Sequence, residues 1–197
     1  RQYMHLVSQS PTTLPTDLWV PSTDRSKPQT AVQGSIGYFQ NFKDNTYEMS
    51  VEGYYRRLWN QIEYAEGAND DGTQETEDQF VYGDGYAYGA EFFVKKRYGK
   101  FNGWVGYTLS WSERRFDDIN NGTPFRAKFD RRHDASVVVM YDVNEKWDVS
   151  ATWVYGSGQN TTLPVQWYFV GGEVTNVYGP RNDYRMAAYH RLDLSAT

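Results

Sequence analysis

Apolar and polar residues alternate with a period of two along several segments of this chain, most clearly between Gly103 and Trp111. Odd positions of this segment include Val105, Tyr107 and Leu109, whereas its even positions are mostly small or polar. A period of two predicts a β-strand with one apolar and one polar face. The apolar face must lie against a protein core or against lipid, and that choice decides which functions are open to the chain.

The same alternation predicts eight strands, and no segment shows a convincing helical period. The predicted strands are 1–7, 30–42, 46–57, 85–97, 102–114, 133–142, 146–157 and 187–197. Short turns are predicted at 43–45, 98–100 and 143–145, and long loops at about 8–29, 58–84, 115–132 and 158–186. All seven prolines are predicted to lie in the loops, because Pro cannot donate to a strand ladder. Short turns alternating with long loops predict an all-β, antiparallel up-and-down transmembrane β-barrel.

In the five clearest strands, one phase carries no charge over 47–55, 88–94, 103–111, 135–141 and 149–155, as contact with lipid would require. Glu48, Glu52, Glu91 and Lys95 all fall in the other phase, and an Arg or Lys facing the middle of a bilayer costs about 2–4 kcal/mol. The residues predicted to face lipid are Val51, Phe92, Val105, Leu109, Val137, Val139, Val149 and Trp153. Aromatic residues near the ends of this phase are predicted to form a girdle at the lipid headgroups, namely Tyr47, Tyr55, Tyr107, Trp111, Tyr141 and Tyr155.

Composition is compatible with a membrane barrel and excludes several other classes. The chain has 17 Tyr, 10 Phe and 7 Trp in 197 residues, yet its mean hydropathy is only −0.77. No apolar run is long enough for a transmembrane helix. A net charge of −5 argues against nucleic acid as a partner, and the absence of Cys excludes disulfides and thiolate metal sites.

Both ends of the sequence lie in strand-like alternation, and no signal peptide appears at its start. We therefore expect the chain to be an internal piece of a longer polypeptide. A second interpretation of the alternation stays open, in which the apolar phase points into a soluble barrel or sandwich. The position of the aromatic residues and the mixed charges of the polar phase favour lipid over that interpretation.

Six motifs, taken in order, cover almost the whole chain. They are Leu-Pro-Thr-Asp-Leu-Trp-Val-Pro (14–21), Tyr-Tyr-Arg-Arg (54–57) followed by Asn-Gln-Ile-Glu-Tyr (60–64), Gly-Ala-Glu (89–91), Tyr-Thr-Leu-Ser-Trp (107–111), Phe-Asp-Arg-Arg-His-Asp (129–134) and Tyr-His-Arg-Leu-Asp-Leu-Ser (189–195). In this order the motifs resemble the late barrel strands of TonB-dependent outer-membrane transporters. The closest resemblance is to the Bacteroidota type with a carboxypeptidase-regulatory-like N-terminal domain.

The resemblance implies that residues 1–197 form part of a plugged barrel of about 22 strands. The plug, the final strands and the N-terminal region that engages the TonB complex would lie outside this chain. Such a protein resides in the cell outer membrane of Gram-negative bacteria and imports a scarce nutrient, such as a siderophore, metal chelate, glycan or peptide, into the periplasm. Two alternatives remain: an outer-membrane barrel that docks a partner lipoprotein at the surface, and a soluble carbohydrate-binding β domain.

Candidate ligand-binding residues are the large aromatic and Arg side chains of the predicted loops and upper lumen, which suit stacking on sugars, chelates or peptides. They are Trp19, Arg25, Trp59, Tyr64, Phe125, Arg126, Trp167, Tyr168, Tyr178 and Arg181.

No catalytic motif occurs in the sequence, so we predict neither an enzyme nor a cofactor. The run Asn-Asp-Asp-Gly at 69–72 offers oxygen ligands but lacks the spacing of a calcium loop, and no metal site is predicted. His133 and His190 are expected to form hydrogen bonds just above the lipid. The run 130–134 is expected to organise the loop entry through charge-assisted hydrogen bonds.

Overall fold

In a computed structural model of the chain, which describes residues 3–7, 18–65 and 76–197, nearly all regular structure is antiparallel β-structure. Two short 3-10 helices, η1 and η2, interrupt the strands. The elements are β1 (Met4–Val7), β2 (Leu18–Pro21), β3 (Thr30–Phe42), β4 (Tyr47–Tyr64), η1 (Thr76–Gln79), β5 (Phe80–Lys96), β6 (Phe101–Arg115), η2 (Asn120–Gly122), β7 (Phe125–Arg126), β8 (His133–Asn144), β9 (Trp147–Gly156), β10 (Asn160–Thr161), β11 (Pro164–Val170), β12 (Glu173–Tyr178), β13 (Tyr184–Arg185) and β14 (Tyr189–Ala196). Within the described ranges, no helix is both long and apolar enough to cross a membrane.

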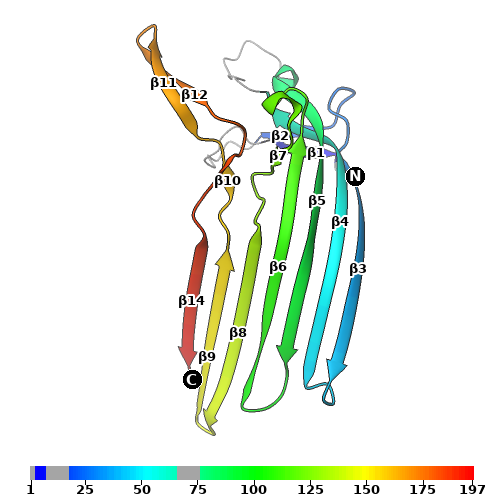
Figure 1. Cartoon of the computed structure of the whole chain (residues 1–197), viewed down its shortest axis with the longest axis vertical. Helices are drawn as coiled ribbons and strands as arrows, with labels where there is room; N and C mark the ends of the chain where they lie inside the picture. Colours follow the sequence, from blue (N-terminus) through cyan, green and yellow to red (C-terminus); the bar gives the residue numbers. More distant parts are fainter. Residues whose placement is uncertain (1–2, 8–17, 66–75) are drawn as a thin grey trace.

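One large sheet dominates the molecule (Figure 1). Its seven long strands follow the order β14-β9-β8-β6-β5-β4-β3, and the short β7 pairs with β6 at the loop end. Neighbouring strands are antiparallel throughout. Short turns lie at one end of the sheet and long connections at the other, here called the turn end and the loop end. The predicted all-β antiparallel class is therefore confirmed.

The tight turns follow from residues that tolerate positive φ. Lys43, Asp44 and Asn45 take φ values of 50°, 52° and 63°, and Gly99 takes 101°. Asp, Asn and Gly adopt this region at lower cost than other residues. The third turn was predicted at 143–145, but β8 extends to Asn144 through an irregularity in its pairing with β9, and the turn falls at 145–146.

Three predictions about strands and loops were wrong. The segment 1–7 does not join the large sheet, because β1 pairs with β2 instead. Strands β4 and β5 continue beyond the predicted limits and pair as far as Tyr64 and Phe80. The segment 158–186 contains a hairpin, β11–β12, and the short pair β10–β13. The period of two is interrupted at these positions, because the β4–β5 register shifts between Leu58 and Gln61 and the apolar residues 167–170 of β11 are consecutive rather than alternating.

The prediction that no proline lies in a strand was also wrong. Pro21 is the last residue of β2 and Pro164 is the first residue of β11. Both positions are strand ends, where a missing N–H group costs the ladder little.

The strand register sorts the side chains onto two faces. Tyr38, Val51, Phe92, Tyr107 and Ala135 form one row across five strands. Because directly opposed residues of antiparallel strands share a face, all fourteen residues predicted to face lipid or to form the girdle lie on the same face as this row. We call it the apolar face.

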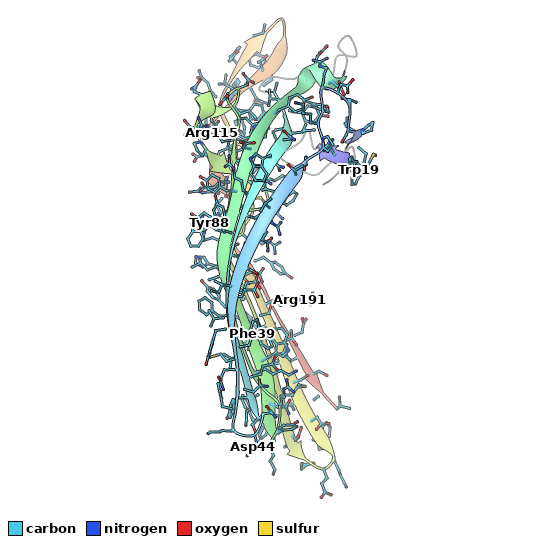
Figure 2. All side chains as sticks on the ribbon, turned by 90° about the vertical axis from the view of Figure 1, so that its right-hand side faces the viewer. Trp19, Phe39, Asp44, Tyr88, Arg115 and Arg191 are labelled. Carbon is cyan, nitrogen blue, oxygen red and sulfur yellow. The ribbon has the colours of Figure 1, made fainter. Side chains whose placement is uncertain are left out.

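The opposite, polar face carries the charges. Glu52 lies directly opposite Glu91, and Asp134 continues the same row through Thr108. Figure 2 shows the sheet from its side, with Tyr88 on one side and Arg191 on the other. The aromatic pairs of the apolar face include Tyr88 stacked on Trp111, with ring centroids 5.1 Å apart.

The buried apolar side chains form two small clusters at the loop end and none on the sheet between them and the turns, among the residues described. The clusters are Val20, Tyr64 and Phe80, and Val81, Phe116, Ile119 and Phe125. The chain exposes 13311 Å², whereas a compact monomer of 22.9 kDa would expose about 9,600 Å². The apolar face is therefore left uncovered by the chain itself.

A substitution at Gly103 tests the close approach of β6 and β8. A Cβ atom there would lie 2.0 Å from the carbonyl oxygen of Val138, and the φ of Gly103 is 147°. We expect Gly103→Ala to destabilise the protein by about 2 kcal/mol, measured as a lower urea midpoint of the folded protein. Gly34→Ala on β3 is the control, because a Cβ there meets nothing within 4 Å. Equal midpoints for the two variants would contradict the register at Gly103.

Candidate functional site

A cleft of about 800 Å³ opens at the loop end, between the segment that includes η2 and β7 and the segment that follows β12. Most of its lining is polar. The lining residues are Glu113, Asn120, Asn121, Thr123, Pro124, Phe125, Arg126, Asn176, Tyr178, Gly179, Pro180, Arg181, Asn182 and Asp183. The cleft has the volume of a site for a small or medium-sized ligand.

Hydrogen bonds between the two segments hold the cleft in shape. The backbone N–H of Arg181 donates to Asn120 Oδ1 at 2.8 Å, and the side chain of Asn182 donates to the carbonyl of Arg126 at 2.9 Å. The N–H of Asn182 also donates to Thr162 Oγ1 at 3.0 Å. Asn182 is buried and has a φ of 54°, a conformation that Asn accepts more readily than most residues. The cleft is therefore preformed rather than a gap between independent loops.

A buried carboxylate anchors these segments to the sheet. The side chain of Asp130 is 1% exposed and accepts hydrogen bonds from the backbone N–H of Ser112 at 2.7 Å and from the guanidinium of Arg185. Arg132 lies 3.7 Å from the same carboxylate and 4.5 Å from the ring centroid of Trp111. We call Asp130, Arg132 and Arg185 the latch. It confirms that the run 130–134 organises the loop entry through charge-assisted hydrogen bonds.

Backbone carbonyl groups extend the latch to the connection after β9. Arg185 Nη1 donates to the carbonyl groups of Asp130 and Gly158, both at 2.8 Å. Asn160 is buried, and its side-chain amide donates to the carbonyl groups of Ala127 at 3.0 Å and Asp130 at 3.2 Å. The latch thus joins the loops after β6 and β9 to the short strand β13.

Arg181, which lines the cleft, interacts electrostatically with Glu63, and Glu63 interacts in turn with Arg114. Burial raises the pKa of the Glu63 carboxyl, and the positive charges of Arg181 and Arg114 oppose this shift. Burial also lowers the pKa of Arg114, with the charge of Glu63 acting in the opposite direction. Arg181 Nη2 donates to the carbonyl of Tyr64 at 2.8 Å. The guanidinium of Arg181 is therefore fixed to the end of β4, while Arg181 also lines the cleft.

The hairpin β11–β12 projects from the loop end beyond the rest of the molecule (Figure 1). Trp167 lies opposite Asn176, and Phe169 lies opposite Val174. By strand alternation Tyr178 shares this side of the hairpin. We call it the hairpin face, and define it as Trp167, Phe169, Val174, Asn176 and Tyr178. Two members of the face, Asn176 and Tyr178, also line the cleft.

The structure brings together about half of the predicted ligand-binding residues. Phe125, Arg126, Tyr178 and Arg181 line the cleft, and Trp167 joins them through the hairpin face. Phe125 is nevertheless buried and packs on Phe116, with ring centroids 6.0 Å apart. Its role in the cleft is therefore mainly to support the wall.

The other predicted residues lie elsewhere. Tyr168 points to the opposite side of the hairpin. Tyr64 is buried against Phe80, and Trp59 is half-buried in β4. Trp19 is exposed on β2, and Arg25 is paired with an acid, 2.7 Å from Asp78 Oδ1.

The sequence analysis missed the side-chain amides. Asn120, Asn121, Asn176 and Asn182 all line the cleft. All four lie in segments that were predicted to be loops, where Asn is common in turns, a role that Asn120, Asn121 and Asn182 also fulfil with positive φ. Phe169 was also missed, although Trp167 and Tyr168 of the same segment were selected.

The histidines occupy different environments. Tyr107 Oη and His133 Nδ1 lie 2.8 Å apart on the apolar face, so the hydrogen bond expected for His133 is present. Within the described ranges, no group of three or more His, Cys, Asp or Glu residues is arranged to hold a metal ion. The run 69–72 lies outside the described residues.

His5 makes the β1–β2 pair sensitive to pH. The ring is fully buried, and its Nε2 lies 3.0 Å from Ser22 Oγ. Burial lowers the pKa of His5 below the ordinary value of 6.5, and the interaction of the ring with the Ser26 backbone, which raises the pKa, only partly offsets this. Because the folded-state pKa lies below the unfolded value, the pair is most stable above pH 6.5 and loses stability as the pH falls below it.

We expect hydrogen exchange of the β2 amides to become faster as the pH is lowered from 7.5 to 5.5, after correction for the intrinsic exchange rate. His5→Gln should remove this pH dependence, because Gln does not titrate. The same pH dependence in His5→Gln would show that another group controls the pair.

The chain matches no protein-family model and no curated protein. Its function must therefore be argued from the motifs of the sequence and from the geometry of the sheet and the cleft.

Proposed function

We propose that this chain is part of the β-barrel of a TonB-dependent outer-membrane transporter that imports a scarce nutrient into the periplasm. The observation that carries the proposal is the apolar face, which continues across seven long antiparallel strands without a charge in its central rows. The first charged residues on that side of the sheet occur near its ends, at Lys96, Arg57 and Glu113. A hydrocarbon layer imposes this distribution, because a charge near its centre is costly.

Exposure of the apolar face supports lipid rather than water as its solvent. Ile36 is 81% exposed and Leu194 is 74% exposed, and both lie on this face. Monomeric soluble proteins rarely expose contiguous apolar patches of more than a few hundred Å². The polar face, with Glu52, Glu91 and Asp134, then faces the lumen of the barrel.

The two edge strands support a larger barrel. β3 and β14 both run from the loop end to the turn end (Figure 1). They cannot pair with each other antiparallel, so an all-antiparallel barrel requires an odd number of further strands between them. Both edges also carry exposed apolar residues, a feature that soluble proteins avoid because such edges pair with other chains. The longer polypeptide would supply these strands, in accord with a barrel of about 22 strands.

The transport role rests on the resemblance of the motifs and on the cleft. The loop end carries a preformed cleft at the side where long loops of such barrels meet the exterior. A plug and an N-terminal segment for the TonB complex would come from the rest of the polypeptide. The cleft is then the part of the entry site that this chain contributes.

The proposal is tested on the full polypeptide that contains these residues, extracted from membranes in detergent. We expect an intact mass several times 22.9 kDa and nutrient uptake by cells that ceases when TonB is deleted. A cell that lacks the polypeptide but keeps TonB is the control for uptake through other receptors. A protein that remains soluble without detergent would overturn the membrane assignment, and uptake that is independent of TonB would overturn the transport mechanism.

A further inference from the structure

The hairpin face presents three aromatic rings along one line that leads to the cleft. Trp167, Phe169 and Tyr178 are 63%, 67% and 55% exposed. Trp167 and Phe169 meet edge to face with ring centroids 5.7 Å apart. A two-stranded hairpin alone is marginally stable in water. Its exposed aromatic rings would be covered, and the hairpin stabilised, by a bound ligand. The hairpin face is therefore a candidate binding surface.

The cleft at the foot of the hairpin is polar but carries no net charge. Two acidic residues, Glu113 and Asp183, balance two basic residues, Arg126 and Arg181. Glu113 also accepts a hydrogen bond from Tyr86. Asn120 and Asn182 already bond within the cleft, whereas Asn121 and Asn176 are exposed there and supply amide groups that both donate and accept hydrogen bonds. The balanced charges therefore favour neither an anionic nor a cationic ligand. The amides favour a ligand with many groups that can each donate and accept hydrogen bonds.

An apolar ligand does not fit this lining. It would remove the exposed amides of Asn121 and Asn176 from water without giving them partners, which is unfavourable. A peptide offers one donor and one acceptor for each backbone unit, separated by side chains of varied charge. A sugar chain offers hydroxyl groups, each both donor and acceptor, along its whole length, and its ring faces of C–H groups can stack on aromatic rings.

We propose that the cleft and the hairpin face together bind a neutral oligosaccharide. Tyr178 and Trp167 stack on sugar rings, Phe169 supports Trp167 through their edge-to-face contact, and Asn176 and Asn121 bond to the hydroxyl groups at the inner end. Asn176 and Tyr178 belong to both surfaces, so one ligand can occupy both at once. This names the substrate class of the transporter proposed above and rests on that proposal for the transport step, whereas binding itself does not require it.

Binding is tested on the full polypeptide in a detergent without a sugar headgroup, because a glycoside detergent would compete for the site. An array of neutral, acidic and sulfated oligosaccharides identifies the preferred class, and calorimetry measures the affinity of the best neutral ligand. A mixed oligopeptide digest and a ferric siderophore serve as the other ligand classes. We expect binding to neutral oligosaccharides alone.

Matched variants locate the site on the hairpin. Tyr178→Ala and Trp167→Ala each should weaken binding about tenfold, because each removes a stacking ring. Tyr168→Ala and Thr175→Ala lie on the opposite side of the same hairpin and should change affinity less than about twofold. Absence of binding to every neutral oligosaccharide, preference for a charged ligand or peptide, or equal effects of the two variant pairs would overturn the inference.

The two proposals fail in different ways. Loss of sugar binding in a membrane protein that still takes up another nutrient through TonB overturns only the oligosaccharide inference. A soluble protein that binds sugars through Tyr178 overturns the transporter and leaves the binding site in place. A partner protein that occupies the hairpin face in the purified complex and blocks sugar binding permanently would also overturn the inference.

Discussion

Replacement of Val137 by Arg is expected to prevent assembly into a membrane, whereas the same replacement at the adjacent Ser136 is expected to be tolerated. Val137 lies between Val105 and Trp153 in a central row of the apolar face. Ser136 lies between Gly106 and Val154 on the polar face. An Arg that faces lipid near the bilayer centre costs about 2–4 kcal/mol, while an Arg in a water-filled lumen remains solvated.

Both variants are made in the full polypeptide, and the fraction in the outer membrane is measured beside the total amount produced. Val137→Arg should leave little assembled protein, and Ser136→Arg should match the unsubstituted protein within about a factor of two. Because both variants introduce the same charge one residue apart, synthesis and charge are controlled. Equal assembly would reverse the assignment of the faces, and the soluble alternative would then account better for the alternation.

Replacement of Asp130 by Asn is expected to release the loops that form the cleft. The substitution leaves Arg185 and Arg132 without their carboxylate in a largely buried site. Removal of one partner from a buried ion pair costs about 3–5 kcal/mol, because the remaining charge stays desolvated. We expect a loss near the lower value, about 3 kcal/mol, since both Arg side chains keep some contact with water.

Hydrogen exchange of segments 127–132, 157–160 and 184–185 measures this effect, because the latch joins these segments. Asp193→Asn is the control: Asp193 pairs with Arg191 on β14 at 2.8 Å, but both side chains are more than half exposed. An exposed pair contributes about 0–1 kcal/mol, so exchange in the control should hardly change. If exchange in the three segments is equally slow in Asp130→Asn, the latch does not hold the loops. Ligand binding in the same variant then reports whether the cleft depends on it.

The long strands could be predicted because each residue on them has one of only two orientations. Val105, Val137 and Trp153 fall on one face whatever their neighbours are, since the period of two is a property of the backbone. The prediction of strand pairing was poorest, because the period of two does not say which strands lie side by side. β1 was assigned to the large sheet because its sequence alternates, but pairing depends on which edge a segment reaches, and β2 offered the nearer one.

The candidate site was predictable only in its residue types. Arg126, Arg181 and Tyr178 were selected as large side chains in loops, and the structure places them in one cleft. The Asn residues of the same cleft could not be distinguished from turn formers, because Asn is favoured in turns for its backbone and in binding sites for its amide. Tyr64 and Phe125 were selected for the same reason as Tyr178, yet the loop packing buries them.

The sequence by itself determined the β class, the two faces of the long strands and the alternation of short turns with long loops, because these follow from local periodicity and turn chemistry. Only the tertiary structure decided which distant residues meet: Asp130 with Arg185, Asn120 with Arg181, and the hairpin face with the cleft. The physical reason is that loop contacts join residues tens of positions apart through single hydrogen bonds and buried charges. Such contacts leave no repeating pattern along the chain.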